Sequence, residues 1–202
     1  MRSLRTKVAG VAAAVAVIGM TGIGSAGAAT PAAATPFAAQ VEAAGLTGSQ
    51  AASLQSRVDQ ILHQYKGSKQ VAANEISLPH GSSVLLPLPG QKYARVLPGA
   101  VNLGFAPATA AGTINNCPYE YFCMWQGETW SGEQFNVSTC NEDQELPGSG
   151  WDSTGSYLNN ETPNTSAYLL DKSKTVIATI PQGLSDYAYP WGPVWYADAC
   201  VR

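Results

Sequence analysis

The chain has 202 residues, a formal net charge of −3, 45% hydrophobic residues and 12% charged residues. The length allows one or two small domains. The acidic balance argues against a nucleic-acid partner, because a phosphate backbone repels an excess of carboxylates.

Residues 1–29 have the pattern of a secretory signal peptide. Arg2, Arg5 and Lys7 precede an apolar run over residues 8–20, and small residues follow up to Ala29. A membrane anchor is the alternative interpretation, but the apolar run is too short to span a bilayer comfortably. We therefore expect a secreted, extracellular protein that has no membrane partner once the signal is removed.

Residues 30–42 are rich in alanine, proline and threonine and are interpreted as a disordered linker. Residues 43–98 follow as a small extension. Within it, Thr47 and Gln50 have the spacing of a capping box, and apolar residues recur at helical intervals from Leu54 onward. These signals predict a helix over residues 49–65.

The extension continues with two strand-like runs, QVAANEISL and SVLLPLP, joined by the turn PHGS. One helix on one β-hairpin buries too little apolar surface to be stable alone. We therefore expect this extension, a candidate pro-region, to need a partner surface.

Residues 99–112 are interpreted as a second linker, after which the composition changes. All four cysteines and all five tryptophans lie beyond residue 116, so residues 113–202 are assigned to a disulfide-braced domain. The residues beyond 116 carry a formal charge of −8, whereas residues 30–116 carry +2. Opposite charges favour docking of the extension on the domain. Two independently solvated surfaces are the alternative.

An even number of cysteines in an exported chain favours disulfides over a zinc site. The four are Cys117, Cys123, Cys140 and Cys200, with no C-x2-C spacing and no histidine beyond His80. Four cysteines allow three pairings, and we favour Cys117 with Cys123 and Cys140 with Cys200. The second bond would close a loop of about 60 residues and contribute on the order of 4 kcal/mol by the chain-entropy argument.

The stretch EYFCMWQGETWSGEQFNVS combines strand-like alternation with a break at QGET. Trp125 precedes the break, and Trp130 lies two residues before Gly132. A glycine in this place lets the backbone take a positive φ and fold over an aromatic face without a Cβ clash. The pattern predicts a folded hairpin. Further strand-like runs, AYLLD, TVIATI and PVWYADA, follow between turns.

Three stretches, CPYEYFCMWQGETWSGEQF, SYLNNETPNTSAYLLD and PWGPVWYADAC, carry a resemblance to a known family. The chain resembles the secreted actinobacterial proteins of peptidase inhibitor family I36, relatives of the Streptomyces metalloproteinase inhibitor. The resemblance covers residues 113–202. It implies an all-β fold, a βγ-crystallin-like sandwich of two Greek-key motifs, here preceded by the helix-plus-β-hairpin extension.

The resemblance also implies inhibition of a secreted, thermolysin-like metallopeptidase by a monomer. A protein inhibitor presents a rigid, substrate-like loop, and rigidity lowers the ordering cost of binding. The loops over residues 141–153 and 181–193 are candidates for this role. A thermolysin-like cleft prefers an apolar residue, which Leu146 or Leu184 would supply.

Calcium is the one cofactor to consider, because βγ-crystallin motifs often bind it through an N/D-N/D-x-x-S/T-S stretch. Here Asn159 and Asn160 are followed by Thr165 and Ser166, with two residues too many between the pairs. Oxygen ligands suit this hard cation. The alternative is an ordinary turn.

An enzyme is not expected, because the domain has no histidine, no G-x-S-x-G, no P-loop and no H-E-x-x-H. The alternative functions are a secreted calcium- or carbohydrate-binding module and an antimicrobial, toxin-like protein. For sugar stacking, Trp151 and Trp191 beside loop glycines are the candidate exposed rings.

Overall fold

The computed structural model describes residues 37–99, 116–148 and 151–202. The expected signal peptide, the first part of the 30–42 linker and nearly all of the 99–112 linker lie outside these residues. All described residues belong to the unit Ala34–Arg202. None of the described helices is both long enough and apolar enough to cross a membrane.

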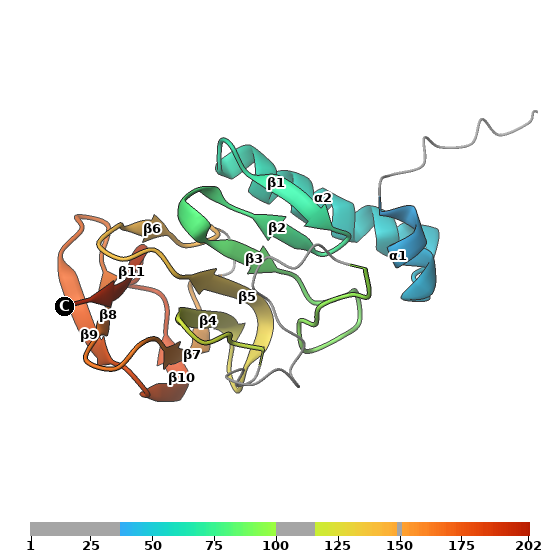
Figure 1. Ribbon diagram of the computed structural model, residues 1–202. Helices are drawn as coiled ribbons and strands as arrows, with labels where there is room; N and C mark the ends of the chain where they lie inside the picture. The colour runs from blue at the N-terminus through green and yellow to red at the C-terminus, as the bar shows by residue number, and fades with distance from the viewer. Residues whose placement is uncertain (1–36, 100–115, 149–150) are drawn as a thin grey trace, which may run out of the picture. The chain divides into compact units, whose positions relative to one another are not determined.

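The fold is mostly β, with two antiparallel sheets and a small helical part (Figure 1). The helical elements are α1 (Ala38–Ala43), α2 (Gly48–Gln64) and the short 3₁₀ turn η1 (Pro79–Gly81). The strands are β1 (Lys69–Ala72), β2 (Glu75–Ser77), β3 (Ser83–Leu85), β4 (Tyr121–Gly127), β5 (Ser131–Val137), β6 (Gln144–Glu145), β7 (Thr154–Asn160), β8 (Ser166–Leu170), β9 (Val176–Pro181), β10 (Ser185–Pro190) and β11 (Tyr196–Val201). This confirms the predicted fold class at the level of a mostly β protein with a preceding helix.

Helix α1 begins inside the stretch that was predicted to be disordered, residues 30–42, and ends one residue beyond it. Its sequence, AAQVEA, is rich in alanine, which has the highest helix propensity. Phe37 and Val41 are half-buried against the core, and the side chain of Gln40 accepts a hydrogen bond from the Ala73 backbone N–H at 2.7 Å. Helix propensity and these contacts together account for the order, and the prediction of disorder is wrong over residues 38–42.

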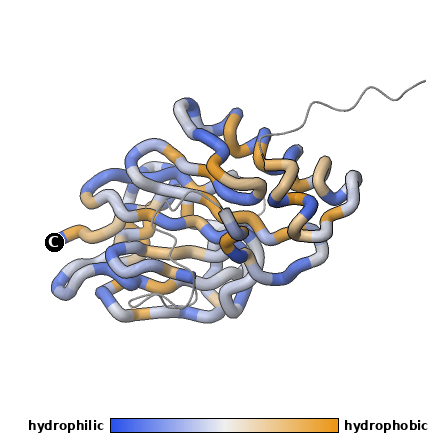
Figure 2. The backbone as a smooth tube through the Cα atoms, turned by 45° about the vertical axis from the view of Figure 1, so that its right-hand side comes forward, coloured by the Kyte–Doolittle hydropathy of each residue, from blue (hydrophilic) through white to orange (hydrophobic). Residues whose placement is uncertain are grey.

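Helix α2 begins with the predicted capping box. The Thr47 side chain accepts a hydrogen bond from the Gln50 N–H, and the Gln50 side chain accepts one from the Thr47 N–H. Leu54, Val58 and Ile61 form its buried face. Apolar and polar residues accordingly alternate along the helix in Figure 2. The helix spans residues 48–64, one residue earlier than predicted at each end.

The run QVAANEISL is not one strand, as predicted, but the hairpin of β1 and β2. The turn lies at Ala73 and Asn74, between the paired residues Ala72 and Glu75. The side-chain amide of Asn74 donates to the carbonyl oxygens of Leu86 and Arg95 at 2.7 and 3.0 Å. These buried tertiary hydrogen bonds hold the turn, and asparagine is a common turn residue.

The first sheet runs across both predicted regions in the strand order β1-β2-β3-β5-β4-β7-β10. Strand β3 of the extension pairs with β5 of the cysteine-rich region, with Val84 opposite Phe135. The partner surface that the extension was expected to need is therefore the edge of this sheet. Figure 1 shows β1, β2 and β3 continuing the sheet beyond β5.

The second sheet has the order β6-β11-β8-β9. One apolar core joins it to the first sheet and to α2. Its buried members include Val58 of α2, Phe122 and Phe135 of the first sheet, and Leu169 and Ala197 of the second. Because all three parts contribute to a single core, removing any one of them would expose apolar surface on the others.

Two disulfides brace the structure in the pairing favoured from the sequence. Cys117 is bonded to Cys123, and Cys140 is bonded to Cys200 across 60 residues. Cys117 and Cys123 are buried together with Trp125 and Leu158 in a second, smaller apolar cluster. Two disulfides are typical of proteins that fold in an oxidising compartment.

Candidate functional site

The candidate site is the tight turn over residues 181–185, called here the Leu184 turn. It connects β9, the edge strand of the second sheet, to β10, the edge strand of the first sheet. Gly183 has a φ of +82°, which other residue types adopt at a cost. The Leu184 N–H closes the turn by donating to the Pro181 carbonyl oxygen at 3.2 Å. The sequence predicted a long loop over residues 181–193, but its middle, Ser185–Pro190, is strand β10.

Asn159 on β7 anchors the Leu184 turn to the first sheet. Its carbonyl oxygen accepts from the Gly183 N–H at 2.8 Å, and its N–H donates to the Leu184 carbonyl oxygen at 2.9 Å. Its side-chain amide donates to the carbonyl oxygen of Ile180 at 2.8 Å. From the other side, the Gln182 N–H donates to the carbonyl oxygen of Thr165 at 3.0 Å. The backbone of the turn is thus held from both sheets.

The side chain of Leu184 projects from this braced turn and is 52% exposed. Val176 and Ile177 on β9 and Tyr187 on β10 are exposed apolar side chains on the same two strands. An exposed leucine on a rigid backbone can enter an apolar pocket of a partner at a low entropic cost. Among the predicted inhibitory residues, Leu184 is therefore the one placed for contact.

Leu146, the other predicted inhibitory residue, lies in the core with only 4% of its surface exposed. Its backbone is covered by α2. The Tyr65 hydroxyl donates to the Glu145 carbonyl oxygen at 2.7 Å, and the Gln64 side chain donates to the Leu146 carbonyl oxygen at 3.3 Å. Its apolar side chain and these helix contacts bury Leu146, so it is not presented to a protease in this structure.

The predicted calcium residues Asn159, Asn160, Thr165 and Ser166 lie at the facing ends of β7 and β8. The Asn159 side-chain oxygen accepts from the Glu161 N–H at 3.1 Å, and the Thr165 hydroxyl donates to the Thr162 carbonyl oxygen at 2.7 Å. The Asn160 side-chain amide donates to the Cys117 carbonyl oxygen at 3.0 Å. These side chains serve the local backbone, and Asn159 and Thr165 hold the Leu184 turn. Their arrangement does not fit an open calcium site.

Glu161 lies beside these residues and was not singled out from the sequence. Its side chain is buried, one carboxylate oxygen accepts from the Thr162 N–H at 3.3 Å, and the other has no hydrogen-bond partner. Burial raises the pKa of Glu161 to about 7. No cluster of three or more histidine, cysteine, aspartate or glutamate side chains suited to a metal occurs among the described residues.

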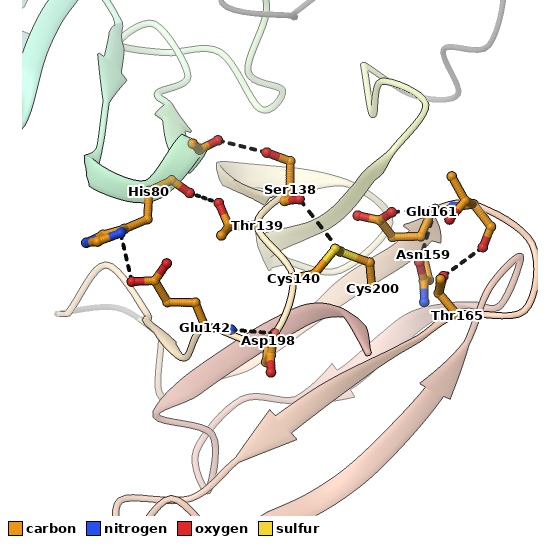
Figure 3. Close-up of a disulfide and its surroundings, with 12 residues drawn as sticks. His80, Ser138, Thr139, Cys140, Glu142, Asn159, Glu161, Thr165, Asp198 and Cys200 are labelled. Atoms are coloured by element: carbon orange, nitrogen blue, oxygen red, sulfur yellow. Dashed lines mark hydrogen bonds and ion pairs between the residues drawn. A yellow bond between two sulfur atoms is a disulfide. The ribbon is translucent and has the colours of Figure 1, made fainter. Parts of the chain in front are cut away.

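The Cys140 to Cys200 disulfide lies where η1 of the extension meets the cysteine-rich region (Figure 3). His80 of η1 contacts the Glu142 carboxylate at 2.7 Å, and its carbonyl oxygen accepts from the Thr139 hydroxyl. The Glu142 N–H in turn donates to the Asp198 carboxylate at 3.0 Å, and burial raises the pKa of Asp198. This contact attaches the extension beside the long-range disulfide.

The tryptophans proposed for sugar stacking are buried. Trp191 is fully buried, and its indole N–H donates to the Trp125 carbonyl oxygen at 2.8 Å. Trp151 packs against Trp191 with ring centroids 5.7 Å apart and is also buried. The flanking glycines suggested exposure, but large aromatic rings gain the most from burial. The exposed indole is that of Trp195.

The predicted hairpin of Trp125, Trp130 and Gly132 is formed by β4 and β5. Gly132 has a φ of +81°, as the pattern predicted, and the Trp125 and Trp130 rings meet edge to face at 4.9 Å. Thr129 and Trp130 also have positive φ, of 50° and 67°. No sequence signal marks these two, because glycine and asparagine are the usual residues in that conformation.

Comparison with protein families, with curated proteins and with solved structures finds no match to this chain.

Proposed function

We propose that the protein is a secreted inhibitor of a thermolysin-like metallopeptidase, with Leu184 as the residue that enters the protease cleft. The observation that carries this proposal is an exposed leucine on a turn whose backbone is hydrogen-bonded to both sheets. The sequence resemblance to secreted metallopeptidase inhibitors points to the same activity. Within this proposal, the finer fold is the βγ-crystallin-like pair of Greek-key motifs.

Rigidity is the physical reason that such a turn can inhibit rather than act as a substrate. A flexible loop loses conformational entropy when it binds, whereas the Leu184 turn has already lost it on folding. Cleavage at the turn would also leave the new ends in place, because Asn159 and Thr165 hold the backbone on both sides of Gly183. Release of a cut product is therefore slow.

The experiment is a titration of thermolysin with the purified mature protein, with the cleavage of a small peptide substrate as the readout. We expect inhibition at about micromolar concentration or below. Leu184→Asp should weaken it by at least about tenfold, since it places a charge where an apolar side chain is buried on binding. The matched control is Val176→Asp, a similarly exposed residue on β9, which should leave inhibition unchanged.

Absence of inhibition by the mature protein at micromolar concentration would reject the proposal in its Leu184 form. Because α2 covers Leu146, the same titration with a variant lacking residues 30–98, carried out on material that circular dichroism shows to be folded, tests the other predicted loop. Inhibition by that shortened form alone would assign the activity to Leu146 and make the extension a mask. Inhibition by neither form would leave no inhibitory function for this chain.

A further inference from the structure

A pocket of about 420 Å³ lies between the segment that follows β3 and the hairpin of β4 and β5. It is called here the Tyr93 pocket, and it is lined by Tyr93, Ala94, Asn116, Trp125, Thr129 and Trp130. It is separate from the Leu184 turn, none of whose residues line it. Its volume is in the range of small-ligand sites.

Hydrogen bonds fix the two walls of this pocket to each other. The Gly132 N–H donates to the Lys92 carbonyl oxygen at 2.8 Å, and Tyr93 pairs with Gly132 in a parallel bridge. The side-chain amide of Asn116 donates to the Ala94 carbonyl oxygen at 3.2 Å. The pocket therefore exists before any ligand binds, which lowers the cost of binding.

The pocket contains an unusual concentration of left-handed backbone. Among the described residues, nine residues other than glycine have positive φ, and Asn116, Thr129 and Trp130 are three of them. Thr129 and Trp130 occupy the two central positions of a turn closed by the Ser131 N–H donating to Glu128. Such turns prefer Asn-Gly, and a β-branched residue there costs free energy. Strain of this kind occurs preferentially at binding sites.

The chemistry of the lining suits a neutral ligand with an apolar face and hydroxyl groups. Of the described lining residues, none carries a charge. Tyr93 is 50% exposed and Trp130 is half-buried, so both present aromatic surface, and the Lys92 ammonium lies over the Tyr93 ring at 5.3 Å from its centroid. The Asn116 amide and the hydroxyls of Thr129 and Tyr93 supply hydrogen-bonding groups. Aromatic rings with amide and hydroxyl groups beside them are the side chains that bind a pyranose, whose C–H face packs on a ring.

The Trp130 ring has a fixed orientation, because its neighbours hold it on two sides. It meets the buried Trp125 edge to face at 4.9 Å and Tyr187 of β10 at 5.2 Å. Tyr187 is 58% exposed, so it extends the aromatic surface beyond the pocket. A second ring next to the first is what a chain of sugars requires.

An extended peptide fits this pocket less well than a sugar does. A bound peptide uses main-chain hydrogen bonds, but here the Thr129 N–H donates to the Tyr187 carbonyl oxygen and the Trp130 N–H to the Ser156 hydroxyl. The Asn116 carbonyl oxygen accepts from the Gln134 side chain. The lining therefore offers its side chains rather than its backbone.

We propose that the Tyr93 pocket binds one sugar ring of a neutral glycan, and that Tyr187 packs on the next ring of the same chain. The site is independent of the proposed protease inhibition, since it shares no residue with the Leu184 turn. It gives a secreted protein a means of attaching to an extracellular polysaccharide.

The test is isothermal titration of the mature protein with cellohexaose and with hexa-N-acetylchitohexaose, in buffer that contains a calcium chelator. We expect one of them to bind with a dissociation constant in the micromolar to millimolar range. Tyr93→Ala should weaken that binding by about tenfold or more, and Tyr187→Ala should weaken the binding of the hexasaccharide but not that of the corresponding monosaccharide. The matched control is Tyr119→Ala, an equally exposed tyrosine that does not line the pocket, which should bind as the parent does.

Three results would overturn the proposal. The first is that neither hexasaccharide binds at about ten millimolar, the weak limit of specific recognition. The second is that Tyr93→Ala binds as well as the parent while its unfolding midpoint is unchanged. The third is that a proline-rich peptide binds to the parent protein but not to Tyr93→Ala, while no glycan binds to either. That result would assign the pocket to peptides. Leu184→Asp should retain full sugar binding, so the outcome does not depend on whether the protein inhibits a protease.

Discussion

At the scale of single residues, the Trp191 ring leaves room for only a glycine at position 155 of β7. A Cβ atom added there would overlap the Trp191 indole nitrogen and the Trp125 carbonyl oxygen. Those two atoms form the buried hydrogen bond that holds Trp191 in the core. The glycine therefore makes room for a tryptophan that lies far along the chain.

Gly155→Ala should accordingly lower the free energy of unfolding by about 3 kcal/mol or more, because it overpacks the core and breaks a buried hydrogen bond. Urea unfolding followed by tryptophan fluorescence measures this change. Gly48→Ala in the first turn of α2 is the control, since an added Cβ there meets nothing within 4 Å. An equal midpoint for Gly155→Ala and the parent protein would show that the Trp191 contact does not require the glycine.

Glu75 on β2 is a residue whose buried environment disfavours its ionised form. Its side chain is buried, and neither carboxylate oxygen has a hydrogen-bond partner. Burial raises the pKa of Glu75 to about 7, from an ordinary value of 4.5. Because the folded-state pKa lies above the unfolded one, the ionised form destabilises the native state. This penalty is fully present above about pH 7 and disappears as the pH falls below about 4.5.

Glu75→Gln should therefore raise the free energy of unfolding at about pH 8, by up to about 3 kcal/mol, and have little effect at about pH 4. Urea unfolding of both proteins at several pH values measures the difference. Glu161 keeps its own raised pKa in both proteins, so it does not contribute to the difference. Glu128→Gln, at an exposed glutamate, serves as the matched control. A constant difference across this pH range would show that Glu75 is not titrating.

At the scale of elements, the docking of α2 depends on a partly buried ion pair. The Arg57 guanidinium donates two hydrogen bonds to the Glu133 carboxylate of β5, one of them at 2.7 Å, and a third to the Pro147 carbonyl oxygen at 3.0 Å. The hydrogen bond to Glu133 is the main cause that raises the pKa of Arg57. This pair joins the helix both to the first sheet and to the loop that carries Leu146.

Replacing either partner alone removes the opposite charge from beside a half-buried group, so Arg57→Met and Glu133→Gln should each cost about 2–3 kcal/mol. The double variant should cost clearly less than the sum of the two, with a coupling energy of about 1 kcal/mol or more. A double-mutant cycle by urea unfolding measures this coupling. The control cycle is Lys174 with Asp143, a more exposed pair at 3.1 Å, which should couple by less than about 1 kcal/mol. Additive effects for Arg57 and Glu133 would contradict the docking role.

At the scale of the whole molecule, one sheet and one core join the extension to the cysteine-rich region. The pairing of β3 with β5 hides what would otherwise be a sheet edge, and α2 covers part of the same core. An exposed sheet edge next to apolar surface favours aggregation. The extension is thus a structural part of the fold as well as a candidate mask over Leu146.

A fragment of residues 113–202 should therefore unfold at lower urea concentration than the mature protein, or aggregate, even with both disulfides intact. Loss of β3 and α2 exposes Phe135 and its apolar neighbours. The measurement is urea unfolding followed by circular dichroism, with a mature protein that lacks only residues 30–36 as the control. A fragment with the midpoint and cooperativity of the mature protein would show that the extension is dispensable for folding.

Several elements were predictable because their signals are local. The capping box of Thr47 and Gln50 and the periodic apolar residues after it defined α2 to within one residue. Gly132 marked the hairpin of β4 and β5, and the structure has the cysteine pairing that was favoured among the three possible ones. The helix and the hairpin depend on residues that are neighbours in sequence, and four cysteines allow only three disulfide pairings.

The predictions that failed concern residues whose role depends on distant partners. Leu146 and Trp191 were predicted to be exposed loop residues. Instead, α2 covers Leu146, and the Trp191 indole is buried and hydrogen-bonded to the Trp125 carbonyl oxygen. The turn at Asn74 was predicted to be the middle of a strand. The hydrogen bonds that hold this turn run from the Asn74 side chain to Leu86 and Arg95, which lie further along the chain. No local pattern records such contacts.

The sequence by itself therefore determined a mostly β chain with a capped helix, two disulfides and a hairpin turned at Gly132. The helix cap and the hairpin depend on residues that are close in sequence, and the presence of disulfides follows from four cysteines in a chain with an export signal. The tertiary structure alone decided which leucine is exposed, which tryptophans are buried and which strand lies beside β5. Exposure depends on what other parts of the chain cover a side chain. Leu146 and Leu184 are the same residue type in similar loop-like sequence, and only the position of α2 and the bracing of the Leu184 turn distinguish them.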